Sequence, residues 1–169
     1  MKNTKVSRPQ SAFAFTCAAF AVLMLMSSGA RAATWKGLEP FVSKRAEVER
    51  VFGPPVSDRL AKDGTLEFDT PDGTVMVFFV TPKFVAAKKL PAALEGTVLQ
   101  IIVQHVSSKD TPESLSLAKN SAYKRRRDKK MDVYSNTKEG IYYTFVDSRL
   151  KTTRYSYAFD RLVRIVRGK

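Results

Sequence analysis

The chain has one cysteine, one histidine and one tryptophan among its 169 residues. Cys17 lies inside an apolar run near the start, too early for a lipid-modified cysteine, and residues 33–169 can form neither a disulfide nor a thiolate metal site. A metal site at His105 would need carboxylates as its other ligands. Neither a glycine-rich phosphate loop nor a Gly-x-Ser-x-Gly motif is present. These absences predict no cofactor, no metal and no catalytic residue, and they favour a protein that is not an enzyme.

Residues 1–32 have the layout of a secretory signal peptide. Three basic residues within the first eight precede an apolar run over residues 11–26, and Ala30-Arg31-Ala32 forms an A-x-A cleavage site. We therefore expect an exported chain, periplasmic or secreted, that begins near Ala33. An uncleaved anchor is the alternative, although the run is shorter than the ~20 apolar residues of a spanning helix.

Removal of residues 1–32 leaves 137 residues, which suits a single domain with a sizeable core. The removed segment holds four of the 29 basic residues and none of the 16 acids, so the formal net charge falls from +13 to +9. A positive surplus favours anionic partners such as lipid head groups, acidic polysaccharide or acidic protein surfaces. It also keeps a protein soluble without any ligand. Export argues against nucleic acid as the partner.

A short helix is expected over residues 43–52. Ser43 is placed to cap it, and Val48, Val51 and Phe52 share one face at spacings of three and four residues. The Gly-Pro-Pro that follows ends the helix. This pattern predicts a helix that docks by one face on a sheet formed by the chain downstream.

Most other elements are predicted strands. Residues 65–68 and 75–80 flank Thr70-Pro71-Asp72-Gly73, which fits a type I turn closing a hairpin. Further strands are expected over residues 97–106, 131–135, 141–146 and 149–159, while residues 162–166 extend the sheet or pack as a tail. Residues 81–96 have no clear period and are expected to form a long surface loop, a candidate contact region.

A second helix is expected to begin at Thr111-Pro112-Glu113, a typical helix start. It would run into residues 124–130, here called the basic segment, which contains Lys124, Arg125, Arg126, Arg127, Lys129 and Lys130. Positive charge at a helix C-terminus is stabilised by the helix dipole, so the segment needs no ligand. Alternatively it binds an anion with strong salt dependence. The fold class is then α+β, with two short helices packed on an antiparallel sheet in the order helix, hairpin, strand, possibly twice.

The polar residues offer weak candidates for catalysis. His105 shares a strand face with Leu99, Ile101 and Val103, and we interpret it as a partly buried structural residue. Residues 47 and 49 are both glutamates, but positions two apart on a helix do not share a face. Asp69 and Asp72 bracket the hairpin turn, where aspartate bonds locally.

Four tyrosines, Tyr142, Tyr143, Tyr155 and Tyr157, lie on predicted strands near the basic segment. Aromatic rings beside arginines can stack on bases or sugar rings. Tyrosines on strands more often fill the core between sheet and helix, with the hydroxyl at its edge.

The segment from Trp35 to Pro55 resembles a group of uncharacterised exported bacterial proteins. It contains Trp-x-Gly at residues 35–37, then Ser-x-Arg-x-x-Val-Glu at residues 43–49 and Gly-Pro-Pro. The start is also similar to SmpA/OmlA-type outer-membrane assembly lipoproteins, which have a β-lactamase-inhibitor-like fold. The resemblance implies an envelope or secreted binding module with small helices on a curved antiparallel sheet, and it brings no catalytic residues with it.

The sequence therefore predicts an exported, non-enzymatic domain that binds a protein or an anionic envelope component. The expected contact regions are an exposed sheet face, the loop at residues 81–96 and the basic segment. The alternative is an envelope hydrolase or inhibitor-like domain, for which acids should converge with His105 in one pocket. A purely structural envelope protein is the third possibility.

Overall fold

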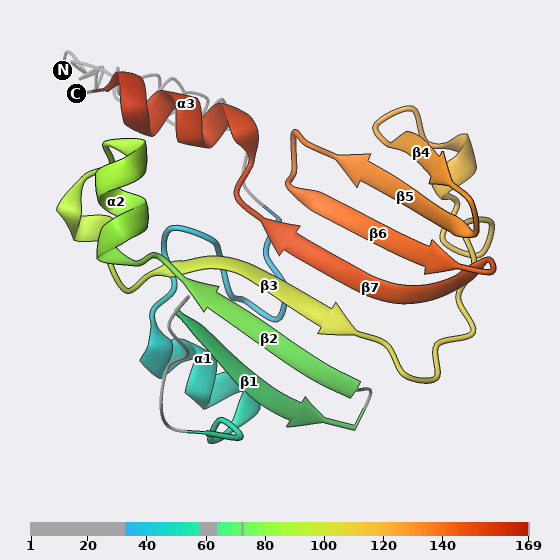
Figure 1. Cartoon of the computed structure of the whole chain (residues 1–169), viewed down its shortest axis with the longest axis horizontal. Helices are drawn as coiled ribbons and strands as arrows, with labels where there is room; N and C mark the ends of the chain where they lie inside the picture. The colour runs from blue at the N-terminus through green and yellow to red at the C-terminus, as the bar shows by residue number, and fades with distance from the viewer. Residues whose placement is uncertain (1–32, 58–63, 72, 169) are drawn as a thin grey trace, which may run out of the picture.

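The computed structural model describes residues 33–57, 64–71 and 73–168, so the expected signal peptide lies outside the described residues. The described part forms one seven-stranded sheet in the order β1-β2-β3-β7-β6-β5-β4 (Figure 1). Every neighbouring pair is antiparallel, and β1 and β4 are the two edges. The α+β class with an antiparallel sheet is confirmed. The expected pair of helices is not, because three α-helices accompany the sheet within these residues.

In chain order the elements are α1 (Arg45–Phe52), β1 (Thr65–Thr70), β2 (Gly73–Phe79), α2 (Pro82–Lys88), η1 (Ala92–Leu94), β3 (Val98–Gln104), η2 (Leu117–Lys119), β4 (Lys124–Asp128), β5 (Met131–Asn136), β6 (Ile141–Val146), β7 (Arg149–Ser156) and α3 (Phe159–Arg167). β1, β2 and β3 make one meander, and β4 to β7 make another. The two meanders join where β3 pairs with β7. Each predicted strand has a counterpart among these seven.

Helix α1 is the docking helix that the sequence predicts. Val48 is fully buried against β1, β2 and β3, and Val51 and Phe52 pack beside it. The cap differs from the prediction, because the Ser43 hydroxyl accepts from the Glu39 amide instead. The first turn is satisfied by the Glu47 carboxylate, which accepts from the Lys44 amide at 2.8 Å.

The prediction of a long loop over residues 81–96 is wrong, because this segment contains α2 and η1. Thr81 caps α2 by accepting from the Phe84 amide at 3.2 Å, and Pro82 takes the first helical position. Phe84 and Val85 then pack on a cluster of Phe41, Val80 and Leu90. The segment is therefore anchored, although its lysines remain exposed.

The prediction of a helix beginning at residue 111 is also wrong. The Thr111 and Ser114 side chains each accept from the other residue's amide, which closes a single turn. Ser116 then has a left-handed φ of +55° and ends it. The change of direction at Ser116 places Leu117 in a core cluster with residues of β5, β6 and β7. The short helix η2 is the helical segment that follows.

Strand β3 contains an irregularity that divides its side chains between two cores. The pairing with β2 shifts at Phe79, so that Val98 and Ile101 are both buried in the cluster under α1. Leu99 instead packs with the α2 and α3 cluster. The expected common face of Leu99, Ile101 and Val103 is therefore wrong for Leu99, since a bulge shifts the alternation by one residue.

The C-terminal run is a helix rather than a strand or tail. β7 ends at Ser156, and α3 lies beside α2 (Figure 1). Leu162 and Ile165 of α3 pack on the same cluster as α2. Arg161 forms an ion pair with Glu39, which ties α3 to the segment before α1. Among the described residues, no helix has the length and hydrophobicity to cross a membrane.

Candidate functional site

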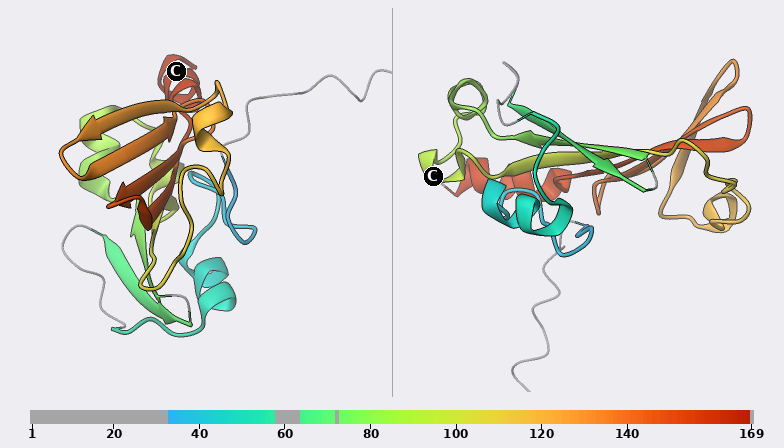
Figure 2. Two further views of the ribbon diagram at one scale, coloured as in Figure 1. Left: turned by 90° about the vertical axis from the view of Figure 1, so that its right-hand side faces the viewer. Right: turned by 90° about the horizontal axis from the view of Figure 1, so that it is seen from below.

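The two faces of the sheet differ in what covers them. α1 and the segment that contains η2 lie on the same side of the sheet (Figure 2). On this covered face, Ile101, Val103, Tyr134 and Phe145 are all buried. The covered face therefore carries the core of both meanders.

The opposite side, here called the open face, follows from the strand register. Met76 pairs with Ile102, Ile102 with Arg154, and Arg154 with Tyr142. None of these side chains is fully buried. The open face also carries Glu67, Phe78, Gln100, Gln104, Lys124, Arg126, Val133, Thr144 and Thr152, all partly or fully exposed. The side chains of the open face are therefore at least partly accessible at these positions across the sheet.

The basic segment is strand β4 with the turn that follows, so its expected placement at a helix end is wrong. Alternation along a strand sends Arg125 and Arg127 to the covered face, while Lys124 and Arg126 lie on the open face. Lys129 is in the turn, and Lys130 lies 4.0 Å from Asp147 in an exposed pair that adds little stability. The six charges do not form a single cluster.

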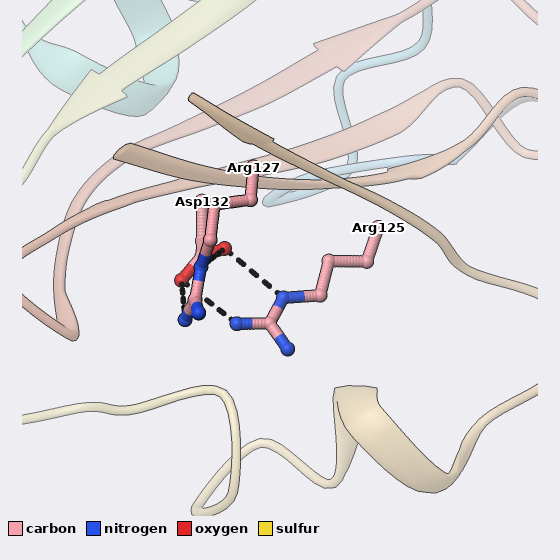
Figure 3. Close-up of polar contacts among 3 residues, drawn as sticks. All are labelled: Arg125, Arg127 and Asp132. Atoms are coloured by element: carbon pink, nitrogen blue, oxygen red, sulfur yellow. Dashed lines mark hydrogen bonds and ion pairs between the residues drawn. The ribbon is translucent and has the colours of Figure 1, made fainter. Parts of the chain in front are cut away.

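Arg125 and Arg127 share one acid (Figure 3). Each donates two hydrogen bonds to the Asp132 carboxylate, with nitrogen–oxygen distances of 3.0–3.1 Å. Arg125 also lies over the Tyr134 ring at 5.7 Å. Asp132 is 6% exposed, and its bonds to Arg127 and Arg125 hold its pKa well below the usual range, against the effect of burial. These two arginines therefore fix the β4–β5 hairpin, and whether the segment binds an anion stays a prediction.

Replacing Asp132 by asparagine should lower the midpoint of thermal unfolding near pH 7. The pKa of Asp132 is lower in the folded protein than in the unfolded chain, where it is about 3.9. The ionised carboxylate therefore stabilises the fold above about pH 3.9, and this stabilisation is lost as the pH falls below that value. The gap between wild type and variant should therefore narrow below about pH 4. Asp128→Asn is the control, since this exposed acid lies on the same hairpin. A gap that is the same at pH 7 and pH 3 would contradict the assignment.

His105 lines a pocket of about 710 Å³ between α1, the β1–β2 turn and residues 107–110, here called the His105 pocket. Its Nε2 lies 2.9 Å from the Thr153 hydroxyl. Asp69 and Asp110 line the same pocket, and Asp110 accepts from Ser108. Among the described residues, no group of three or more His, Cys, Asp or Glu side chains is placed to hold a metal.

Two of the four acids that the sequence singled out have local partners. Glu47 binds the first turn of α1, and Glu49 forms an ion pair with Arg45 at 2.6 Å. Asp69 lies in the wall of the His105 pocket, and Asp72 lies outside the described residues.

Three of the four tyrosines are partly buried against the core clusters. Tyr155 stacks on Trp35 with ring centroids 5.6 Å apart, and Phe52 stacks on the same indole at 5.4 Å. Burial raises the pKa of Tyr155 to about 12. Tyr157 stacks on Phe41, and Tyr143 packs in the cluster below η2.

Tyr142 is different, because it lies on the open face beneath Arg154. The guanidinium carbon is 3.9 Å from the ring centroid. Both residues line a second pocket of about 500 Å³ between the sheet, α2 and α3, here called the Arg154 pocket. Alternation alone could place each residue on this face, but only the register shows that they are directly opposed.

Comparison with known proteins gives no relative. No family model matches the chain, and neither a curated protein nor a solved structure is significantly similar to it. The resemblance to exported bacterial proteins and to SmpA/OmlA-type domains therefore stays a prediction.

Proposed function

We propose that this protein is an exported, non-enzymatic interaction domain of the cell envelope, and that its open face binds a protein partner. One observation carries the proposal. Met76, Phe78 and Ile102 lie close together on the neighbouring strands β2 and β3 of the open face and remain partly accessible. A contiguous accessible apolar area on a sheet is typical of an interaction surface. The assignment to the envelope rests on the signal-like pattern of residues 1–32.

The two edges of the open face, on either side of this apolar area, carry opposite charges. Glu67 lies exposed on β1 at one edge of the sheet, and Lys124 and Arg126 lie exposed on β4 at the other. An apolar centre with a charged rim is the usual anatomy of a protein interface. A partner with opposite charges at its two ends would be held in one orientation.

An anionic envelope component is a second candidate partner. The supporting observation is that several cations are exposed without structural ion pairs in the described part of the chain, namely Lys83, Lys88 and Lys89 near α2 and Lys124 and Arg126 on β4. Binding of this kind should weaken steeply as salt increases.

The alternative of an envelope hydrolase or inhibitor-like domain is kept because His105, Asp69 and Asp110 line one pocket. His105 is already bonded to Thr153, and Asp110 to Ser108. These contacts give each group a structural role, so the interaction domain is the preferred function.

Affinity capture from envelope extract with residues 33–169 tests the proposal. Ile102→Glu places a charge in the centre of the open face and should weaken retention of the partner at least about thirtyfold, the effect of losing ~2 kcal/mol at an interface hot spot. Ser121→Glu adds the same charge at an exposed position near η2 and should retain the partner.

The salt dependence separates the two candidate partners. Retention at high salt that is lost only with Ile102→Glu supports a protein on the open face. Material lost at high salt and with Lys124→Gln/Arg126→Gln, but kept by Ile102→Glu, would instead identify an anionic component. Equal retention by all variants at both salt concentrations would refute the role of the open face.

A further inference from the structure

The Arg154 pocket lies at the end of the open face near the helices. Its floor is formed by Tyr142 and Arg154 of neighbouring strands β6 and β7. Phe84 of α2 and Phe159 of α3 contribute its walls, and Lys138 stands at the β5–β6 turn. A volume of about 500 Å³ is within the range of small-molecule sites.

Arg154 is the residue that indicates a ligand-binding role for this pocket. It is half-buried, yet its side chain makes no hydrogen bond or ion pair within the described residues and only stacks on Tyr142. Arg125, Arg127 and Arg161, in contrast, all donate to carboxylates. None of the Arg154 nitrogen atoms is buried without a partner, so the five donors stay accessible to solvent and an anion can replace water there. The stack fixes the plane of the group and leaves its edge able to bind an anion.

The rest of the lining limits what that anion is. Lys138 adds a second positive charge, while the exposed Asp160 of α3 opposes both, so the pocket carries one net positive charge. Phe84 and Leu99 offer apolar surface, and Phe159 is 62% exposed. An exposed phenylalanine beside a cation suits a ligand with an apolar body and a single negative charge.

We propose that the Arg154 pocket binds a small monocarboxylate with an aromatic or aliphatic body. The planar carboxylate matches the bidentate fork of Arg154, and the body lies against Phe84, Leu99 and Phe159. This site does not depend on the protein partner proposed above, because free ligand fills it without any second chain.

Calorimetric or NMR titration of residues 33–169 with 4-phenylbutyrate tests this inference, with 4-phenylbutyramide as the uncharged match. The acid should bind with a dissociation constant of about 1 mM or tighter, as expected for a ligand of this size, and the amide at least about tenfold more weakly. This comparison uses the unmodified chain, so it does not depend on any variant folding.

Arg154→Gln should raise the dissociation constant of the acid at least about tenfold, and Arg154→Lys should give an intermediate value because it keeps the charge but loses the fork. Arg50→Gln removes an exposed arginine of α1 that does not line the pocket, and this variant should bind within about twofold of wild type. Equal binding of acid and amide, wild-type affinity in Arg154→Gln, or no binding of the acid at ~10 mM would each overturn the proposal.

Discussion

Replacing Gly140 with alanine should lower the free energy of unfolding by about 3 kcal/mol or more. Gly140 has a φ of +78°, and a Cβ at this position would lie 2.2 Å from the backbone oxygen of Ser156. The Ser156 amide donates to the Gly140 oxygen at 2.8 Å, so neither backbone can move away without losing that bond. The β5–β6 turn and the end of β7 depend on this close approach.

Gly96→Ala is the matched control for this prediction. Gly96 has nearly the same backbone conformation, with a φ of +73°, but a Cβ at this position would meet no atom within 4 Å. Its replacement should cost only the conformational penalty of about 1 kcal/mol. Urea unfolding of both variants measures the difference, and equal losses would show that the contact with Ser156 is not restrictive.

Phe145→Ala should destabilise the protein by about 3–5 kcal/mol. Phe145 is fully buried on the covered face, where its ring meets Tyr134 edge-on with centroids 5.8 Å apart. Leu117 and Leu150 close the same cluster. This second core is small, so removal of its central ring leaves a cavity that few neighbours can fill.

Phe78→Ala provides the comparison on the other side of the sheet. Phe78 is the same residue type but lies partly exposed on the open face, so its truncation should cost only about 1 kcal/mol. Denaturant unfolding of the two variants tests the difference between the faces. If Phe78→Ala were as destabilising as Phe145→Ala, the open face would be part of the core rather than a surface for a partner.

The strands with alternating or strongly apolar patterns could be predicted from sequence, and so could α1 with its Gly-Pro-Pro end. The dipeptide Thr-Pro did not by itself predict a helix start. Thr81-Pro82 begins α2, whereas Thr111-Pro112 begins a single turn that Ser116 ends. The left-handed backbone at Ser116 serves to bury Leu117, a tertiary contact that local sequence does not reveal.

Strand β4 gave no sequence signal because its five residues are all exposed and charged. It forms through pairing with β5 and through Asp132, which lies opposite Arg127. Helix α3 did carry a signal that could have predicted it, since Phe159, Leu162 and Val166 recur at helical spacing.

The candidate site was predictable only in part. One solvent-facing side of the sheet follows from the glutamines of β3, but its extent across seven strands requires the register. The opposition of Arg154 and Tyr142 depends on the β6–β7 pairing, and the pocket above them depends on where α2 and α3 pack. These are long-range features that no local pattern encodes.

Site-specific photo-cross-linking in envelope extract tests the binding role of the open face most directly. Residues 33–169 contain no cysteine, so Gln104→Cys on the open face and Arg50→Cys on α1 each give one attachment point at an exposed position. A benzophenone probe at residue 104 should capture a defined protein, and Ile102→Glu should abolish that product. Capture of the same protein from residue 50 instead, or no product from residue 104, would contradict a partner on the open face.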